Sequence, residues 1–211
     1  LTVHNILKLE VVLMSGESVT IGADALDMPG YDLLALMTGS EGMLGVVTEV
    51  TVRLLPKPAV ARVILAAFDD LAMAGNAVAA IIGAGIIPGG LEMMDNLAIR
   101  AVEDFVHAGY PRDAAALLLC ELDGTESEVE AGIRVVTRIL ELQGATEIRV
   151  ATDEAERQRF WSGRKNAFPV VGRISPDYYC IDGTIPKKRL GEVLTGISKL
   201  SNEYDLRVAN V

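Results

Sequence analysis

The segment "LLALMTGSEGMLGVVTEVTVRLLPKP" (residues 33–58) joins a glycine-rich loop directly to a strand pattern. Its glycines stand three residues apart, at positions 39, 42 and 45, and alternating valines follow them. Glycine adopts backbone conformations closed to other residues and leaves room for a close neighbour. The spacing therefore predicts either a tight turn that needs positive φ angles or a loop whose bare backbone amides meet a phosphate, a ribose or a flavin ring.

This loop differs from the two common nucleotide-binding motifs. Its glycines lead into a strand rather than out of a strand into a helix, so it is not the dinucleotide-binding fingerprint. It also lacks the Lys-Ser/Thr pair of a P-loop. Spacing alone leaves both interpretations of the loop open.

The strand after the loop, at residues 46–54, alternates in polarity and ends at Pro56, because proline cannot donate to a ladder. We place a domain boundary there, between residues 1–58 and residues 59–211. Within residues 1–58, the sequence also predicts three short elements: a hairpin at residues 6–22, a loop at residues 28–30 and an apolar helix around residues 32–37.

From residue 59 onward, strand patterns and helix patterns alternate along the chain. Strands are predicted at residues 60–68, 86–94, 115–122, 146–151, 178–185 and 206–211. Helices are predicted at residues 71–83, 96–106, 125–144, 153–168 and 186–204. The alternation fits a parallel doubly wound sheet or ferredoxin-like units with an antiparallel sheet. Short strands with polar positions favour the second, so we predict an α+β fold with a mainly antiparallel sheet and helices on one face.

Charge and hydropathy exclude several classes of partner. Lys and Arg number 19 against 29 Asp and Glu, which gives a net charge of −10 and no basic patch. This charge balance argues against nucleic acid and anionic lipid surfaces as partners. An anionic ligand must be held by backbone amides or by one or two placed basic side chains. No apolar run reaches the length of about 18 residues that a membrane span needs.

The cysteines and histidines indicate no metal site. Cys120 and Cys180 both lie in apolar, strand-like runs, which predicts buried free thiols in a reducing compartment. His4 and His107 are far apart and show no ligand spacing with each other or with a cysteine.

Two longer segments resemble one family. "GYDLLALMTGSEGMLGVVTEVTVRLLPKP" (residues 30–58) resembles the end of the FAD-binding domain in the vanillyl-alcohol oxidase/para-cresol methylhydroxylase (PCMH) superfamily. Within it, the Gly-Ser-Glu-Gly-x-x-Gly-Val-Val-Thr-Glu run is typical of FAD-linked 2-hydroxyacid dehydrogenases and oxidases of the glycolate oxidase FAD-linked subunit type. "WSGRKNAFPVVGRISPDYYCIDGTIP" (residues 161–186) resembles the cap domain of the same family.

The resemblance covers essentially the whole chain. It implies that residues 1–58 are the C-terminal part of a PCMH-type FAD-binding domain. Residues 59–211 would then be a truncated, ferredoxin-like FAD-linked oxidase C-terminal domain, which caps the substrate. We expect a fragment, because the family's pyrophosphate-binding loop would precede Leu1 and its histidine-containing segment would follow Val211. Such a fragment is expected to be inactive alone. Because the histidine-containing segment would lie beyond Val211, the metal dependence of the whole protein stays open.

The resemblance also implies FAD as the cofactor. Backbone atoms of Gly42, Gly45 and Val47, together with Glu41, would line it. A Cβ atom at position 42 or 45 would then push the cofactor away. Because the surrounding segment is acidic, amide donors rather than Lys or Arg must face FAD.

Arg164 is the candidate catalytic residue. From the residues alone, it is either a surface arginine of a basic helix or a bidentate clamp for a carboxylate, which suits a guanidinium fork. The resemblance implies the second role, on the substrate carboxylate, with Arg173 as the alternative. Trp161 and Phe168 either wall this pocket or pack in the core.

Three acidic residues are weaker candidates. Asp182 is either a general base or, more commonly before Gly-Thr, a hydrogen-bonding residue at a strand end. Glu92 and Asp95 are candidates to face the flavin edge.

The activity that the resemblance implies is oxidation of a 2-hydroxy acid, of the glycolate or D-lactate type, to the 2-oxo acid by hydride transfer to flavin. Two alternatives stay open: a flavin-dependent transferase of the same superfamily and a non-catalytic ferredoxin-like binding module. The implied partners are the small 2-hydroxy acid, an iron–sulfur subunit and a second flavin-type subunit. We expect a cytoplasmic protein, or one held at the inner membrane through those subunits.

Overall fold

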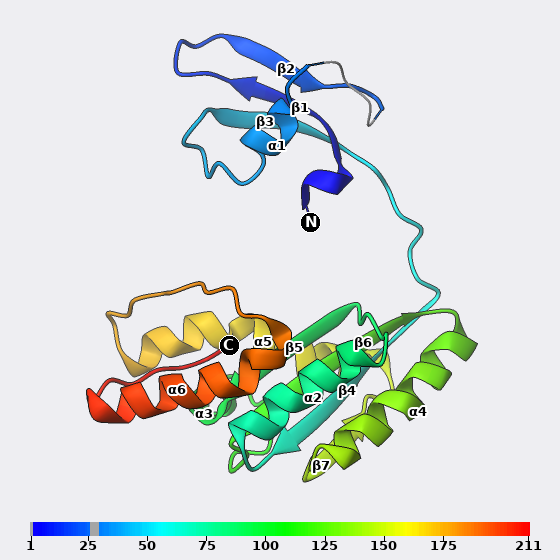
Figure 1. The fold of residues 1–211 in the computed structure, drawn as a ribbon, viewed down its shortest axis with the longest axis vertical. Helices are drawn as coiled ribbons and strands as arrows, with labels where there is room; N and C mark the ends of the chain where they lie inside the picture. The colour runs from blue at the N-terminus through cyan, green and yellow to red at the C-terminus, as the bar shows by residue number, and fades with distance from the viewer. Residues whose placement is uncertain (1, 26–29) are drawn as a thin grey trace. The chain divides into compact units, whose positions relative to one another are not determined.

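The computed structural model describes residues 2–25 and 30–211, so of the predicted loop at 28–30 only Gly30 lies within the described residues. The chain divides into two compact units, Leu1–Lys57 and Pro58–Val211. Each unit has its own sheet and its own buried core (Figure 1).

The first unit is a three-stranded antiparallel sheet with strand order β2-β1-β3. Its elements are the 3₁₀ turn η1 (Thr2–Asn5), β1 (Ile6–Val12), β2 (Ser18–Gly22), helix α1 (Leu33–Met37) and β3 (Val46–Val52). The predicted hairpin and short helix are confirmed, and β3 ends two residues before the predicted end at residue 54. The small buried core of this unit consists of Ile6, Leu9 and Val11 on β1 and Met37 on α1. Most of β3 is exposed.

The second unit is built on a four-stranded sheet with strand order β5-β6-β4-β7, in which every pair is antiparallel. Its strands are β4 (Val60–Phe68), β5 (Gly90–Asp95), β6 (Ala116–Gly124) and β7 (Glu147–Val150). Its helices are α2 (Leu71–Gly83), α3 (Asn96–Phe105), α4 (Glu126–Leu142), α5 (Glu154–Ile174) and α6 (Leu190–Glu203), with a 3₁₀ turn η2 (Lys187–Arg189) before α6. Without α3, the order up to β7 is the β-α-β-β-α-β arrangement of ferredoxin-like folds. The predicted α+β class and antiparallel sheet are confirmed.

The prediction of helices on one face is wrong. Helices α2 and α4 cover one face of the sheet, while α3 and α5 cover the other (Figure 1). The reason is visible in β4 and β6, where consecutive residues rather than alternate ones are apolar and buried, from Val63 to Phe68 and from Ala116 to Cys120. A strand of this kind has an apolar side chain on each face, and both faces must be covered.

Four further predictions in the second unit are wrong. The structure has no strand at residues 178–185 or at residues 206–211. Helix α5 continues to Ile174 and contains Pro169, instead of ending near residue 168. Cys120 is a buried free thiol, as predicted, and burial raises its pKa to about 12. Cys180 is exposed, because the strand expected to bury it is not formed.

Candidate functional site

The glycine loop before β3 has an unusual backbone. Gly39, Glu41 and Gly42 adopt φ angles of +83°, +53° and +79°. Two turn hydrogen bonds hold it, from the Ser40 amide to the Met37 carbonyl at 3.1 Å and from the Met43 amide to the Ser40 carbonyl at 2.9 Å. A positive φ is sterically unfavourable for Glu41, and such strain concentrates at functional sites. The loop therefore combines backbone strain at Glu41 with surface exposure of Glu41 and Gly42, two of the predicted cofactor contacts.

The two predicted glycine contacts differ in their surroundings. A Cβ atom at Gly42 would meet nothing within 4 Å. A Cβ atom at Gly45 would lie 2.7 Å from Val11 Cγ1 and 2.9 Å from the Val12 carbonyl oxygen, both on β1. Close packing inside the unit is therefore sufficient to require glycine at position 45, whereas Gly42 has a positive φ and open space beside it.

Val47 lies beside an irregularity in β3. It pairs with Val11, while Glu49 pairs with Glu10, so that Thr48 is an extra residue between the two pairs. The Thr48 hydroxyl donates to the Glu10 carbonyl at 3.2 Å. A bulge of this kind bends a strand and changes the direction of its side chains. Glu41, Gly42, Gly45 and Val47 thus share one continuous loop-and-bulge segment of the first unit.

Arg164 belongs to the second unit, on α5. Its Nε donates to Glu92 Oε2 at 3.1 Å, across to strand β5. Its side chain is 27% exposed, and within the described residues no acceptor is recorded for its two Nη atoms. The guanidinium is therefore held through Nε, and its Nη edge keeps donors for a bidentate contact with a carboxylate.

A second polar cluster lies on the same helix and was not predicted. Arg157 donates from Nε and Nη2 to the two oxygens of Glu121, at 2.9 and 3.0 Å. Trp161 Nε1 donates to Glu121 Oε2 at 2.6 Å. The indole also packs on β5, because a Cβ at Gly90 would lie 2.9 Å from its ring. The one signal in the sequence was a glutamate inside the apolar run "ALLLCEL", where an unpaired carboxylate would be costly.

The remaining candidates from α5 and the segment after it have other contacts. Arg173, the alternative clamp, stacks over the Phe105 ring with its Cζ 4.5 Å from the ring centroid. Phe168 is 49% exposed and makes an edge contact with Tyr178, with 6.0 Å between the centroids. Asp182 lies in an exposed segment without strand structure, so its strand-end interpretation is wrong.

The two acidic candidates of β5 have different roles. Glu92 pairs with Arg164, as described above. Asp95 is buried, and its carboxylate accepts from the Ala98 amide at 3.1 Å and from both nitrogens of Asn210 at 2.7 and 2.8 Å. Burial raises the pKa of Asp95, and these hydrogen bonds oppose that rise. Asp95 caps α3 and fixes the segment around Asn210.

Within residues 2–25 and 30–211, no three His, Cys, Asp or Glu side chains lie close enough together to hold a metal ion. No helix in that part of the chain is both long and apolar enough to cross a membrane.

Comparison with known proteins places the chain in a family. The model of the family described as FAD linked oxidases, C-terminal domain, matches residues 57–211. The glycolate oxidase subunit GlcD of Escherichia coli (strain K12) is 70% identical over 211 residues, which is 100% of this chain and 42% of that protein. The mitochondrial D-lactate dehydrogenase [cytochrome] of Arabidopsis thaliana is 29% identical over 204 residues, 95% of this chain and 35% of that protein. The chain thus spans less than half the length of these relatives.

A solved structure shares the fold. An alkyldihydroxyacetonephosphate synthase superposes with a TM-score of 0.67 at 17% identity, over 94% of this chain and 41% of the other. At such low identity the likeness shows the fold alone. The family match covers most of the chain, from the start of the second unit to Val211. The chain therefore belongs to the FAD linked oxidases and contains their C-terminal domain.

Proposed function

We propose that the intact protein is an FAD-dependent oxidoreductase that converts a 2-hydroxy acid of the glycolate or D-lactate type to the 2-oxo acid. The observation that carries this proposal is the 70% identity with a glycolate oxidase subunit over the whole chain. When bound, FAD supplies the acceptor for the hydride that leaves the α-carbon of the substrate. The residues of this chain supply binding and orientation.

We assign residues 1–58 to the end of the FAD-binding domain and residues 59–211 to the cap domain. The division of the chain after Lys57 supports this assignment, as does the family match that begins at residue 57.

The loop residues fit FAD as backbone ligands. Residues 38–47 contain no Lys or Arg, so an anionic cofactor would rely on amide donors there. Gly42 offers open space and a positive φ, which lets a ligand approach the backbone closely. Backbone atoms of Gly42, Gly45 and Val47, together with Glu41, would line the cofactor.

Arg164 would bind the substrate carboxylate through its Nη edge, while Glu92 keeps the guanidinium oriented through Nε. A fork of two parallel N–H donors matches a carboxylate in geometry as well as in charge. This contact anchors one end of the substrate and is the same for every 2-hydroxy acid.

The Escherichia coli relative is named as a subunit of glycolate oxidase, which supports a multi-subunit enzyme here. We propose an iron–sulfur subunit and a second flavin-type subunit as partners that accept the electrons. The enzyme would act in the cytoplasm or at the inner membrane through these partners.

The test is anaerobic reduction of the intact flavoprotein with a panel that includes glycolate and D-lactate. At least one 2-hydroxy acid should bleach the flavin absorption band. A protein that carries flavin but is bleached by none of them would contradict the proposal. Reaction with an ether-lipid precursor instead would favour the transferase, and absence of any flavin would favour the binding module.

Arg164→Lys tests the clamp. A hydrogen bond to a charged group contributes about 1.5–3 kcal/mol, so this variant should raise KM at least about tenfold. The matched control is Arg159→Lys on the same helix, because Arg159 is exposed and pairs only weakly with Glu156, at 3.3 Å. Equal KM values for wild type and Arg164→Lys would remove Arg164 from the site.

A further inference from the structure

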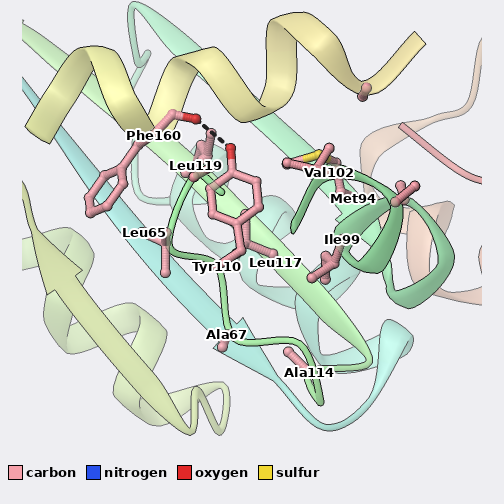
Figure 2. Close-up of a cluster of buried hydrophobic side chains, with 14 of the residues drawn as sticks. Leu65, Ala67, Met94, Ile99, Val102, Tyr110, Ala114, Leu117, Leu119 and Phe160 are labelled. Atoms are coloured by element: carbon pink, nitrogen blue, oxygen red, sulfur yellow. Dashed lines mark hydrogen bonds between the residues drawn. The ribbon is translucent and has the colours of Figure 1, made fainter. Parts of the chain in front are cut away.

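The side chain of Tyr110 reaches into the backbone of the helix that carries Arg164. Tyr110 lies between α3 and β6 and is 4% exposed. Figure 2 shows its ring pointing from this connection to α5, where the hydroxyl donates to the backbone carbonyl of Phe160. The Phe160 carbonyl is the group with which the backbone amide of Arg164, four residues later, pairs in a regular α-helix.

Helix α5 has a glycine at the point where the phenol approaches. A Cβ atom at Gly163 would lie 2.5 Å from Tyr110 Cζ and 2.6 Å from Cε2, closer than real side chains ever approach. Glycine in the middle of a helix is unfavourable compared with alanine. The approach of the phenol gives a physical reason for glycine at this position.

Tyr110 is itself fixed at its other end. Its backbone amide donates to Glu103 Oε1 at 2.8 Å, and Glu103 is a buried residue of α3. The preceding carbonyl, of Gly109, accepts from Arg149 Nη2 at 2.5 Å. Burial raises the pKa of Tyr110, so the hydroxyl remains protonated at neutral pH and continues to donate. The phenol is a rigid link between α3 and α5.

We propose that Tyr110 is a positioning residue for Arg164. By donating to the Phe160 carbonyl, one helical turn before Arg164, and by packing against Gly163, the phenol fixes the position of α5 at the turn that presents the guanidinium. Glu92 fixes the other end of Arg164, through Nε. The inference rests on the proposed role of Arg164 as the carboxylate anchor.

The test uses Tyr110→Phe in the intact flavoprotein, because this change removes only the hydroxyl and keeps the packed ring. KM for the 2-hydroxy acid should rise about fivefold while kcat changes less than about twofold, since the anchor is used in the bound ground state as well as in the transition state. In an Arg164→Lys background, the same change should have no further effect on KM, because two residues that act through one contact are not additive.

A second pair of variants covers the case in which Tyr110→Phe does not fold. Gly163→Ala should raise KM in the same way, because its methyl group displaces the phenol. Gly172→Ala on the same helix is the matched control, since its Cβ would lie 3.6 Å from Tyr178 Cε1, an ordinary contact. The control should keep the wild-type KM.

Hydrogen exchange of α5 separates failure of this inference from failure of the proposed function. Tyr110→Phe should lower amide protection around residues 160–164 whether or not a substrate is known. Lower protection with an unchanged KM, or additive KM effects with Arg164→Lys, would overturn the positioning role and leave the proposed function intact. A wild-type flavoprotein that no 2-hydroxy acid reduces would instead overturn both.

Discussion

Gly45→Ala should mainly lower the stability of the protein, whereas Gly42→Ala should mainly lower its affinity for FAD, and the contrast tests why the loop contains glycine. Both positions were predicted to line FAD. In the structure, Gly45 is buried against β1, whereas Gly42 is exposed with open space beside it. The same added methyl group therefore meets protein at one position and free space at the other.

The expected magnitudes follow from these surroundings. At Gly45 the methyl would lie 2.7 Å from a methyl group of Val11, which is fully buried, and 2.9 Å from a backbone oxygen of Val12. Overpacking costs about 1–3 kcal/mol, and a backbone oxygen cannot rotate away, so we expect about 2–3 kcal/mol. At Gly42 the cost is that of a positive φ, about 1 kcal/mol.

Two measurements on the intact protein check this contrast. Denaturant unfolding of the apoprotein should show the larger loss of unfolding free energy for Gly45→Ala. Titration of each apoprotein with FAD should show the larger loss of affinity for Gly42→Ala, about tenfold or more if the cofactor touches the loop backbone. Wild-type FAD affinity in Gly42→Ala would refute the assignment of this loop to the cofactor. A loss below about 1 kcal/mol for apo Gly45→Ala would refute the packing explanation.

Two further predictions concern α5 and α4. Arg157→Lys should lower the unfolding free energy by about 1–2 kcal/mol in denaturant titrations, because an ammonium cannot reproduce the fork on Glu121. Arg138→Lys, in an exposed pair, should change it by less than about 0.5 kcal/mol, and equal losses would contradict the reasoning. Thr125→Ala should destabilise α4, because it removes the side-chain half of the capping box, including the hydroxyl hydrogen bond that is the largest cause of the lowered pKa of Glu128. A carboxyl group whose pKa is lowered by folding stabilises the protein above its unfolded pKa of 4.5, and this stabilisation is lost as the pH falls below that value. The difference in melting temperature between wild type and Thr125→Ala should therefore shrink as the pH falls from 7 to below 4.5.

Sequence patterns predicted elements whose signals are local. Helix α4 has its capping residues and its apolar stripe within one short segment, and the structure places it at Glu126–Leu142 with both capping hydrogen bonds. The segment at 178–185 has aromatic and β-branched residues as well, but strand formation also requires a partner strand. No strand of the described residues pairs with it, and its tyrosines are exposed.

The coverage of both faces of the second unit's sheet by helices could have been predicted from the same sequence. The continuous apolar runs of β4 and β6 indicate strands with two buried faces, and this signal is stronger than the polar positions of the short β7. The C-terminal end of α5 could not be predicted from its proline. The loss of one backbone hydrogen bond at Pro169 is offset by packing of Ala167 and Val170 against the sheet, so the helix continues past it.

The polar contacts that hold the arginine helix could not be predicted from any local pattern. Tyr110 and Phe160 are 50 residues apart, and Glu121 and Arg157 are 36 apart. Each contact depends on the sheet first bringing β5, β6 and α5 together. Side-chain type predicted that Arg164 suits a carboxylate, whereas the geometry that leaves its Nη edge available depends on tertiary packing.

The glycine loop shows why spacing alone left two interpretations open. Absence of a Cβ is required wherever another group lies within about 3 Å, and a sequence cannot say whether that group is a strand or a cofactor. At Gly45 the group is a strand of the same unit. At Gly42 the described residues provide no such group, and yet the neighbouring Glu41 retains an unfavourable positive φ. Strain without an internal packing reason is what a ligand contact would explain, so the case for FAD at this loop rests on Glu41 and Gly42 rather than on Gly45.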